Sequence, residues 1–219
     1  MPEDSDTDDE YASERDQLAD ALARRPNVTE RAADAIRAVP RHEFVPDDQR
    51  ANAYEDRPLP IGDGQTISAP HMVAIMASEL ELQAGEDVLE IGTGCGYHAA
   101  VTAELVGADH VYSVEYVESL AEQARRTLES VGYGEVSIRQ GDGHDGWPEH
   151  APYDAAYLTC AAPEFPDAVV DQVRAGGVLV APIGETRQRL VRAEKQEDGG
   201  LVESDEGAVR FVQMQGGTE

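Results

Sequence analysis

The pattern of apolar and polar positions changes character near residue 85. Before that point, apolar residues at helical spacing predict helices over residues 11–25 and 30–39. Asn27 is the expected cap of the second helix, because an acidic residue follows three positions later, and Pro40 ends this helix. The N-terminal part is therefore predicted to be helical.

A long segment without a clear regular element follows these helices. Residues 41–46 are predicted to be extended, and residues 51–65 to form a loop rich in proline and glycine. A loop of this length in a compact domain is often functional. A third helix is expected to begin near Pro70, which suits a first turn, and to run to about Leu80.

From residue 87 onward, short apolar runs alternate with helical patterns. The predicted strands lie near residues 87–91, 110–114, 135–139, 154–158 and 177–181, and the predicted helices near 97–106, 117–131 and 163–173. Such alternation is typical of a parallel sheet with right-handed crossovers. Residues 189–193 and 209–214 are expected to form a closing antiparallel pair. The predicted fold class is α/β, with a Rossmann-like, mostly parallel, doubly wound sheet.

Three segments are expected along the chain. Residues 1–10 are nearly all acidic or small and are predicted to be a disordered acidic tail. Residues 11–84 provide the helical extension with its loop, and residues 85–219 provide the α/β domain. A length of 219 residues suits one such domain plus an extension, and we expect the two parts to form one compact unit.

Composition narrows the possible functions. The chain has 44 acidic and 17 basic residues, a net charge of −27, and Lys195 is its only lysine. Such self-repulsion is tolerated best in concentrated salt, so the composition predicts a halophile's salt-rich cytoplasm. An acidic surface that recruits a basic partner is the competing interpretation. Free nucleic acid is not an expected partner, because phosphate binding needs basic patches.

Neither a membrane span nor a secretory signal is expected, because the sequence has no long apolar run and no basic, then apolar, N-terminal region. The only cysteines are Cys95 and Cys160, which suits a reducing cytoplasm. They follow the first and fourth predicted strands, which are neighbours in the usual doubly wound order. Both are therefore expected to face one ligand pocket.

Residues 88–97 (VLEIGTGCGY) combine an apolar run, an acidic residue and three glycines at alternate positions. A strand that turns at glycines into a helix presents free N–H groups and the positive end of the helix dipole to a ligand. The pattern predicts a nucleotide-type cofactor loop. Together with the ends of the next two strands, the predicted cofactor-binding residues are Glu90, Gly92, Thr93, Gly94, Cys95, Gly96, Glu115, Asp142 and Gly143.

The glycine spacing favours one class of cofactor. A dinucleotide fingerprint has its third glycine three positions after the second, whereas Gly96 follows Gly94 by two. Glu115 ends the second predicted strand, where a carboxylate grips a ribose diol. Ribose recognition without a pyrophosphate cradle favours S-adenosyl-L-methionine over NAD. Asp142 is expected to accept a hydrogen bond from an adenine amino group, and its alternative role is that of an ordinary turn residue.

Ser68 is the other candidate for chemistry. It is either the N-cap of the third helix or part of an anion site formed with the free N–H groups of that helix, and the two roles are compatible. No G-x-S-x-G elbow surrounds it, so a hydrolase nucleophile is not expected. His71 and His98 lie near these loops, but no cluster has metal-ligand spacing, and no metal is assigned.

Residues 31–211 resemble the protein-L-isoaspartate O-methyltransferase family, of a halophilic archaeal type. The resemblance rests on segments in the family's order: 38–46 (AVPRHEFVP), 60–72 (PIGDGQTISAPHM), 88–97, 141–143 (GDG), 153–157 (YDAAY) and 176–184 (GGVLVAPIG). The glycine motif is shared by many methyltransferases, whereas TISAPHM is far more particular to this family. The resemblance implies the fold of the S-adenosylmethionine-dependent methyltransferases.

The resemblance also implies an activity. Members transfer a methyl group from S-adenosyl-L-methionine to the free α-carboxylate of an isoaspartyl residue, and the ester then collapses to a succinimide that can reopen as aspartate. By resemblance, Ser68 is the active-site serine, and the substrate side comprises Thr66, Ile67, Ser68 and His71. Isoaspartyl peptides and proteins are the implied partners of a cytoplasmic enzyme that we expect to be a monomer.

The sequence departs from the family at two places and leaves alternatives open. Cys95 stands where the family often has serine, and residues 211–214 read FVQM where the family's tail often reads FVPL. A methyltransferase for another carboxylate or a small molecule is one alternative, and a cofactor-binding homologue without catalysis is another. A tRNA methyltransferase is disfavoured by the net charge of −27.

Overall fold

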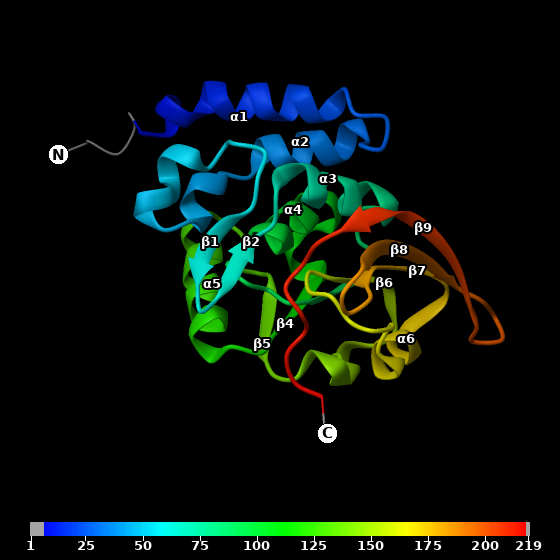
Figure 1. Ribbon diagram of the computed structural model, residues 1–219. Helices are drawn as coiled ribbons and strands as arrows, with labels where there is room; N and C mark the ends of the chain where they lie inside the picture. The colour runs from blue at the N-terminus through cyan, green and yellow to red at the C-terminus, as the bar shows by residue number, and fades with distance from the viewer. Residues whose placement is uncertain (1–6, 218–219) are drawn as a thin grey trace.

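The computed structural model describes residues 7–217, which form a twisted sheet with a layer of N-terminal helices stacked on one side (Figure 1). The helices are α1 (Thr7–Ala23), α2 (Glu30–Ala38), α3 (Pro70–Glu79), α4 (Tyr97–Val106), α5 (Glu118–Ser130) and α6 (Asp167–Gln172). The strands of the main sheet are β3 (Val88–Ile91), β4 (Val111–Glu115), β5 (Ser137–Gln140), β6 (Tyr153–Leu158), β7 (Val173–Ile183), β8 (Gln188–Lys195) and β9 (Leu201–Val209).

The strand order β5-β4-β3-β6-β7-β8-β9 confirms the predicted fold class. β3 pairs in parallel with β4 on one side and with β6 on the other, and β5 and β7 extend the parallel part. β8 and β9 add an antiparallel edge. The strand order therefore reverses between β3 and β6, and ligands of open α/β sheets bind at such a switch point, outside the carboxyl ends of the strands.

Alternate residues of the central strands belong to two separate cores. On β3, Val88 packs in the core shared with α1–α4, whereas Leu89 and Ile91 pack in the core on the other face, together with Val169 of α6. Successive side chains of a strand point to opposite faces, so a strand covered on both faces is a continuous apolar run. This is why the five parallel strands could be predicted from the sequence.

The N-terminal helices share a core with the sheet. α1 packs on α2, and α2 packs on both α3 and α4 (Figure 1). Leu22, Ile36 and Met76 are buried in the same core as Val88. Arg31 of α2 also donates a hydrogen bond to the carbonyl of Leu105 in α4 at 2.8 Å. That residues 11–84 and 85–219 fold as one unit stays a prediction, and this shared core supports it.

The helical boundaries differ from the predictions at two points. α1 begins at Thr7, so the last four residues of the segment predicted to be a disordered tail are helical, and residues 1–6 lie outside the described part. The cap of α2 is Thr29, whose hydroxyl accepts the N–H of Ala32 at 3.3 Å, and not Asn27. Within residues 7–217, no helix is long and apolar enough to cross a membrane.

The segment between α2 and α3 is more regular than predicted. Arg41–Phe44 form a 3₁₀ turn where extended backbone was expected, and this turn buries both its first and its last side chain, since residues three apart share one side. A second 3₁₀ turn covers Asp47–Asn52. The predicted loop 51–65 also holds most of a hairpin, β1 (Leu59–Gly62) with β2 (Gln65–Ile67). Its turn is formed by Asp63 and Gly64, both with positive φ, so this hairpin had an Asp-Gly signal in the sequence that was missed.

The closing antiparallel pair is shifted along the chain. β9 ends at Val209, whereas the prediction placed this strand at residues 209–214. The side chain of Gln188 explains the end of the pairing, because it accepts the N–H of Phe211 at 2.6 Å and donates to the carbonyl of Phe211 at 3.1 Å. Residues 210–217, called the C-terminal tail below, then leave β8 and run across the face of the molecule (Figure 1).

Candidate active site

The glycine loop joins β3 to α4 at the switch point of the sheet. Gly92, Gly94 and Gly96 all have positive φ, which glycine adopts without strain. A Cβ atom on Gly92 would lie 2.4 Å from Thr159 Oγ1, because the loop packs against the end of β6. The backbone therefore forms the wall of the pocket at this position, and a side chain there would clash.

Glu115 ties the glycine loop to the next strand. Its carboxylate accepts the N–H of Gly94 at 2.8 Å and the N–H of Val117 at 2.9 Å. The side chain is 6% exposed and lines the pocket at the end of β4. The structure thus brings together Glu115 and Gly94, which the sequence separates by two secondary-structure elements.

Glu90 lies behind the loop instead of facing the pocket. It is fully buried, and its carboxyl group accepts hydrogen bonds from the Ser113 hydroxyl and, at 2.9 Å, from the Tyr157 hydroxyl. Burial raises the pKa of Glu90 to about 8, because these hydrogen bonds offset only part of the desolvation cost. Glu90 holds β3, β4 and β6 together beneath the loop, so the structure does not support the predicted direct contact with a cofactor.

Gly143 and Asp142 follow β5, but only Gly143 lines the pocket. The carboxylate of Asp142 accepts the N–H groups of His144 at 2.9 Å and of Gly217 in the C-terminal tail at 2.7 Å. Burial alone would raise the pKa of Asp142, but these hydrogen bonds outweigh it and hold the pKa below its usual value. The predicted adenine acceptor is therefore already bonded to the tail, a contact between positions 75 residues apart.

Ser68 reaches the same pocket from the opposite side, between β2 and α3. It is not the N-cap of α3, because Ala69 occupies the cap position and no side chain caps this helix. The carbonyl of Ser68 instead accepts a hydrogen bond from Arg41 at 2.9 Å. Arg41 is wholly buried and also donates to the carbonyls of Ala53 and Arg57, at 2.8 and 3.2 Å.

A groove continues from the pocket to the surface, and Ser68, Thr66 and Thr159 line both spaces. His71 lines the groove only, and its ring Nδ1 lies 2.8 Å from Asp56 Oδ1. Arg210 and Phe211 of the C-terminal tail form the facing wall. Ser68 therefore stands where this pocket, called the inner pocket below, meets the groove.

The structure brings most of the predicted residues together. Of the predicted set, the inner pocket is lined by Thr66, Ile67, Ser68, Gly92, Thr93, Gly94, Cys95, Glu115 and Gly143. It is not lined by Glu90, Gly96, Asp142 or His71. Gly96 has a packing role, since a Cβ atom there would lie 3.0 Å from Leu128 of α5.

Several residues were not predicted to line this pocket. They include His98, Thr159 and, from the C-terminal tail, Val212, Gln213, Met214 and Gln215. His98 directly follows the glycine motif, but it had been treated as a lone structural histidine. The tail residues carried no local signal, because β9 ends only a few residues earlier and the tail reaches the pocket through contacts with Ala161.

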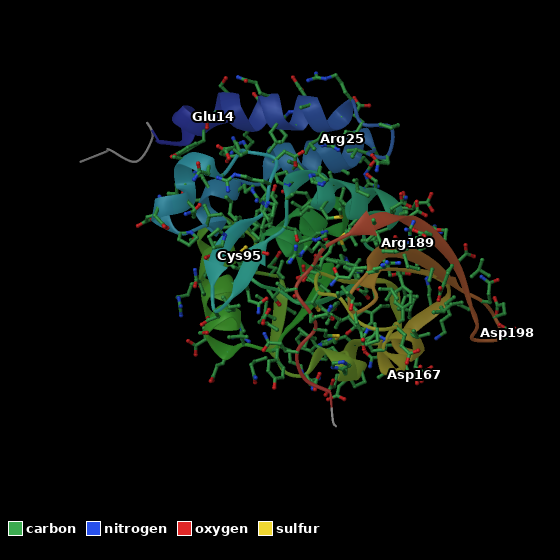
Figure 2. All side chains as sticks on the ribbon, in the orientation of Figure 1. Glu14, Arg25, Cys95, Asp167, Arg189 and Asp198 are labelled. Carbon is green, nitrogen blue, oxygen red and sulfur yellow. The ribbon has the colours of Figure 1, made fainter. Side chains whose placement is uncertain are left out.

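The two cysteines, called the pocket cysteines below, both line the pocket, as their places after β3 and β6 predicted. Cys95 lies in the interior near the hairpin (Figure 2). Burial raises the pKa of the Cys95 thiol to about 11 and that of Cys160 to about 12, so both are protonated at neutral pH. Among residues 7–217, no group of histidine, cysteine and acidic side chains is arranged to hold a metal ion.

Comparison with known proteins agrees with this geometry. The family model described as Protein-L-isoaspartate(D-aspartate) O-methyltransferase (PCMT) matches residues 13–219. The chain belongs to this family. Among PCMT relatives, Protein-L-isoaspartate O-methyltransferase 2 of Archaeoglobus fulgidus is 49% identical over 208 residues, which cover 94% of this chain and 95% of the relative.

Solved structures give the same family and fold. A protein-L-isoaspartate O-methyltransferase has a TM-score of 0.86 at 33% identity, over 92% of this chain and 66% of that chain, so the present chain spans about two thirds of that protein. A structure described as PCMT from Plasmodium falciparum, in complex with S-adenosyl-L-homocysteine, has a TM-score of 0.79 over 92% of this chain and 98% of that one. Its identity of 23% supports the PCMT fold alone.

Proposed function

We propose that this chain transfers a methyl group from S-adenosyl-L-methionine to the α-carboxylate of L-isoaspartyl residues in damaged proteins, which starts their repair through a succinimide. One observation carries the proposal: the glycine loop, Glu115 and Ser68 line a single pocket that opens into a groove. The pocket suits a buried cofactor, and the groove suits a peptide whose carboxylate reaches Ser68. Membership of the PCMT family and 49% identity to a named relative support this assignment.

The residues present fit the cofactor. Glu115 offers a carboxylate to a ribose diol, and Gly92 and Gly143 leave backbone where a Cβ atom would meet a neighbour at 2.4 Å. Asp142 can serve an adenine amino group through a remaining lone pair of its carboxylate, which already accepts the N–H groups of His144 and Gly217. When bound, S-adenosyl-L-methionine supplies an electrophilic methyl group on a sulfonium.

The substrate needs orientation more than activation. A carboxyl group with a pKa of about 4 is ionised at neutral pH, so it attacks without a general base. Ser68 would donate a hydrogen bond from its hydroxyl to one carboxylate oxygen and leave the other oxygen free to face the methyl group. Positioning and the exclusion of water would supply the catalysis, so the reaction needs no acid–base pair.

The direct test measures methyl transfer from labelled S-adenosyl-L-methionine in molar KCl to two matched peptides, one with isoaspartate and one with aspartate. We expect transfer to the isoaspartyl peptide alone, and a loss of about 10²-fold or more in Ser68→Ala, the usual size for an orienting hydrogen-bond donor. Ser130→Ala, at the exposed end of α5, is the matched control and should keep full activity. Equal transfer to both peptides, or to neither, would reject the proposal.

We also propose that the protein works as a monomer in a salt-rich cytoplasm and binds no nucleic acid. The net charge of −27 supports the salt requirement, and acidic side chains such as Glu14, Asp167 and Asp198 lie around the periphery (Figure 2). Activity and thermal stability should rise between dilute and molar KCl, because salt screens the repulsion. Light scattering in molar KCl tests the monomer, and retention on a nucleic-acid column would contradict the last point.

A further inference from the structure

His98 is a buried histidine whose ring has no polar partner on the protein. It lies in the first turn of α4 and is 6% exposed. Among residues 7–217, no group forms a hydrogen bond with either ring nitrogen. The ring lines the inner pocket, and neither nitrogen has a role in the reaction described above.

Packing fixes the position of this ring. It lies against Tyr157, with ring centroids 4.4 Å apart, and the Tyr157 hydroxyl is in turn held by Thr102 and Glu90, each at 2.9 Å. Burial lowers the pKa of His98 to about 3, so the ring is neutral at physiological pH and has one donor and one acceptor nitrogen. An unpaired buried polar group costs about 1–3 kcal/mol, so an apolar side chain would fill this space better unless a ligand pairs with the ring.

The sheet order shows which part of a ligand His98 meets. Along the carboxyl edge, Gly143 follows β5, Glu115 ends β4, the glycine loop follows β3, and the His98 ring packs against Tyr157 of β6. Adenine and ribose are assigned to the first two positions, so the rest of the cofactor crosses β3 towards β6. His98 lines the inner pocket but not the groove, whereas Ser68 lines both. The ring therefore faces the cofactor and not the peptide.

We infer that His98 binds the amino-acid end of S-adenosyl-L-methionine, with its ring N–H donating a hydrogen bond to the carboxylate. The inference rests on the proposed use of this cofactor. A neutral ring can donate this hydrogen bond, and it adds no positive charge beside a sulfonium. His98 is thus a binding residue and takes no proton in the reaction.

The test compares two ligands by calorimetric titration of the full chain in molar KCl. S-adenosyl-L-homocysteine carries the amino-acid end, and 5′-methylthioadenosine has the same adenosine and thioether without it. We expect His98→Leu to weaken binding of the first about 10- to 100-fold, as for hydrogen bonds to charged groups, and to change binding of the second less than about threefold. His98→Gln, which keeps a donor and an acceptor, should restore part of the affinity.

The outcomes separate this inference from the function on which it rests. If the wild type binds S-adenosyl-L-homocysteine and His98→Leu loses affinity equally for both ligands, the ring only shapes the pocket and the inference is wrong. Unchanged affinity for both ligands also overturns it. If the wild type binds neither ligand, the proposed function is wrong, and the inference that rests on it is wrong as well. His98→Leu should melt no lower than wild type without ligand, because it removes unpaired polar atoms; if it does not fold, His98→Gln and His98→Phe give the same comparison.

Discussion

Arg41 should position Ser68, and its replacement should separate catalysis from cofactor binding. The guanidinium is wholly buried over the ring of Tyr97, at 5.0 Å from the centroid, and donates to three carbonyls in the segment that leads to Ser68. Burial lowers its pKa, but an arginine remains charged at neutral pH. Arg41 is therefore the fixed point on which the loop, the hairpin and Ser68 are held.

The expected loss of unfolding free energy in Arg41→Met follows from the carbonyl groups that lose their hydrogen-bond donor. Ala53 is fully buried and Ser68 is half-buried, so their carbonyls lose a charged donor and regain little water. An unsatisfied buried group costs about 1–3 kcal/mol, and the substitution leaves the carbonyls of Ala53 and Ser68 without their donor. We expect a loss of about 3–5 kcal/mol, a large part of the roughly 5–15 kcal/mol that stabilises a typical domain. Arg41→Lys should lose most of this too, because one ammonium cannot span three carbonyls.

The assay combines urea unfolding with methyl transfer and titration of S-adenosyl-L-homocysteine below the unfolding transition. Methyl transfer should fall at least tenfold, whereas cofactor affinity should change less than threefold, because Glu115 and the glycine loop are held by β3 and β4. Arg31→Met is the matched control, since Arg31 also bonds a carbonyl but lies away from Ser68; it should destabilise without slowing the folded enzyme. A stability loss below about 1 kcal/mol in Arg41→Met, or a parallel loss of transfer and affinity, would refute this reasoning.

Three further predictions concern the pocket. Because the pKa of Glu90 is raised in the folded state from 4.5 to about 8, the free energy of unfolding should fall as the pH rises from about 4.5 to 8. Glu90→Gln should remove this pH dependence, measured by urea unfolding at a series of pH values. The same pH dependence in wild type and variant would contradict the prediction. A Cβ atom on Gly143 would lie 2.4 Å from Ile91 Cγ2, so Gly143→Ala should weaken S-adenosyl-L-homocysteine binding at least tenfold, whereas Gly141→Ala, with ordinary contacts, should not. Alkylation of the pocket cysteines should be slow and should slow further with S-adenosyl-L-homocysteine; unchanged labelling of both would exclude a shared pocket.

The fold and the cofactor loop could be predicted because their causes are local. A strand covered on both faces is apolar throughout, and glycines at alternate positions mark the turn that follows β3. Glu115 was found by a topological rule, since the ends of parallel strands meet at one edge. The structure places its carboxylate 2.8 Å from the N–H of Gly94. Local pattern and topology together thus predicted that Glu115 and Gly94 meet at one pocket, although the same reasoning also named Glu90 and Asp142, which do not line it.

The other half depends on partners that the sequence does not pair. Arg41 was predicted in an extended segment, yet the 3₁₀ turn carries its side chain inward to the carbonyls of Ala53 and Ser68. His98 is an ordinary histidine by sequence, and it stands out only because it packs against Tyr157 with no polar group for its nitrogens. A buried polar side chain indicates a ligand site when it has no hydrogen-bond partner on the protein. The sequence alone does not show which residues surround a side chain.

The C-terminal tail is the clearest case of a contact that no local rule provides. Gly217 donates to Asp142, and a Cβ atom on Gly216 would lie 2.5 Å from the same carboxylate, so this approach requires glycine in the tail. Asp142 was assigned from its place after β5, where an acceptor for adenine belongs. That assignment treated the strand end as open, whereas the tail covers it. The acceptor can then be shared between the tail and a cofactor, because each carboxylate oxygen has two lone pairs.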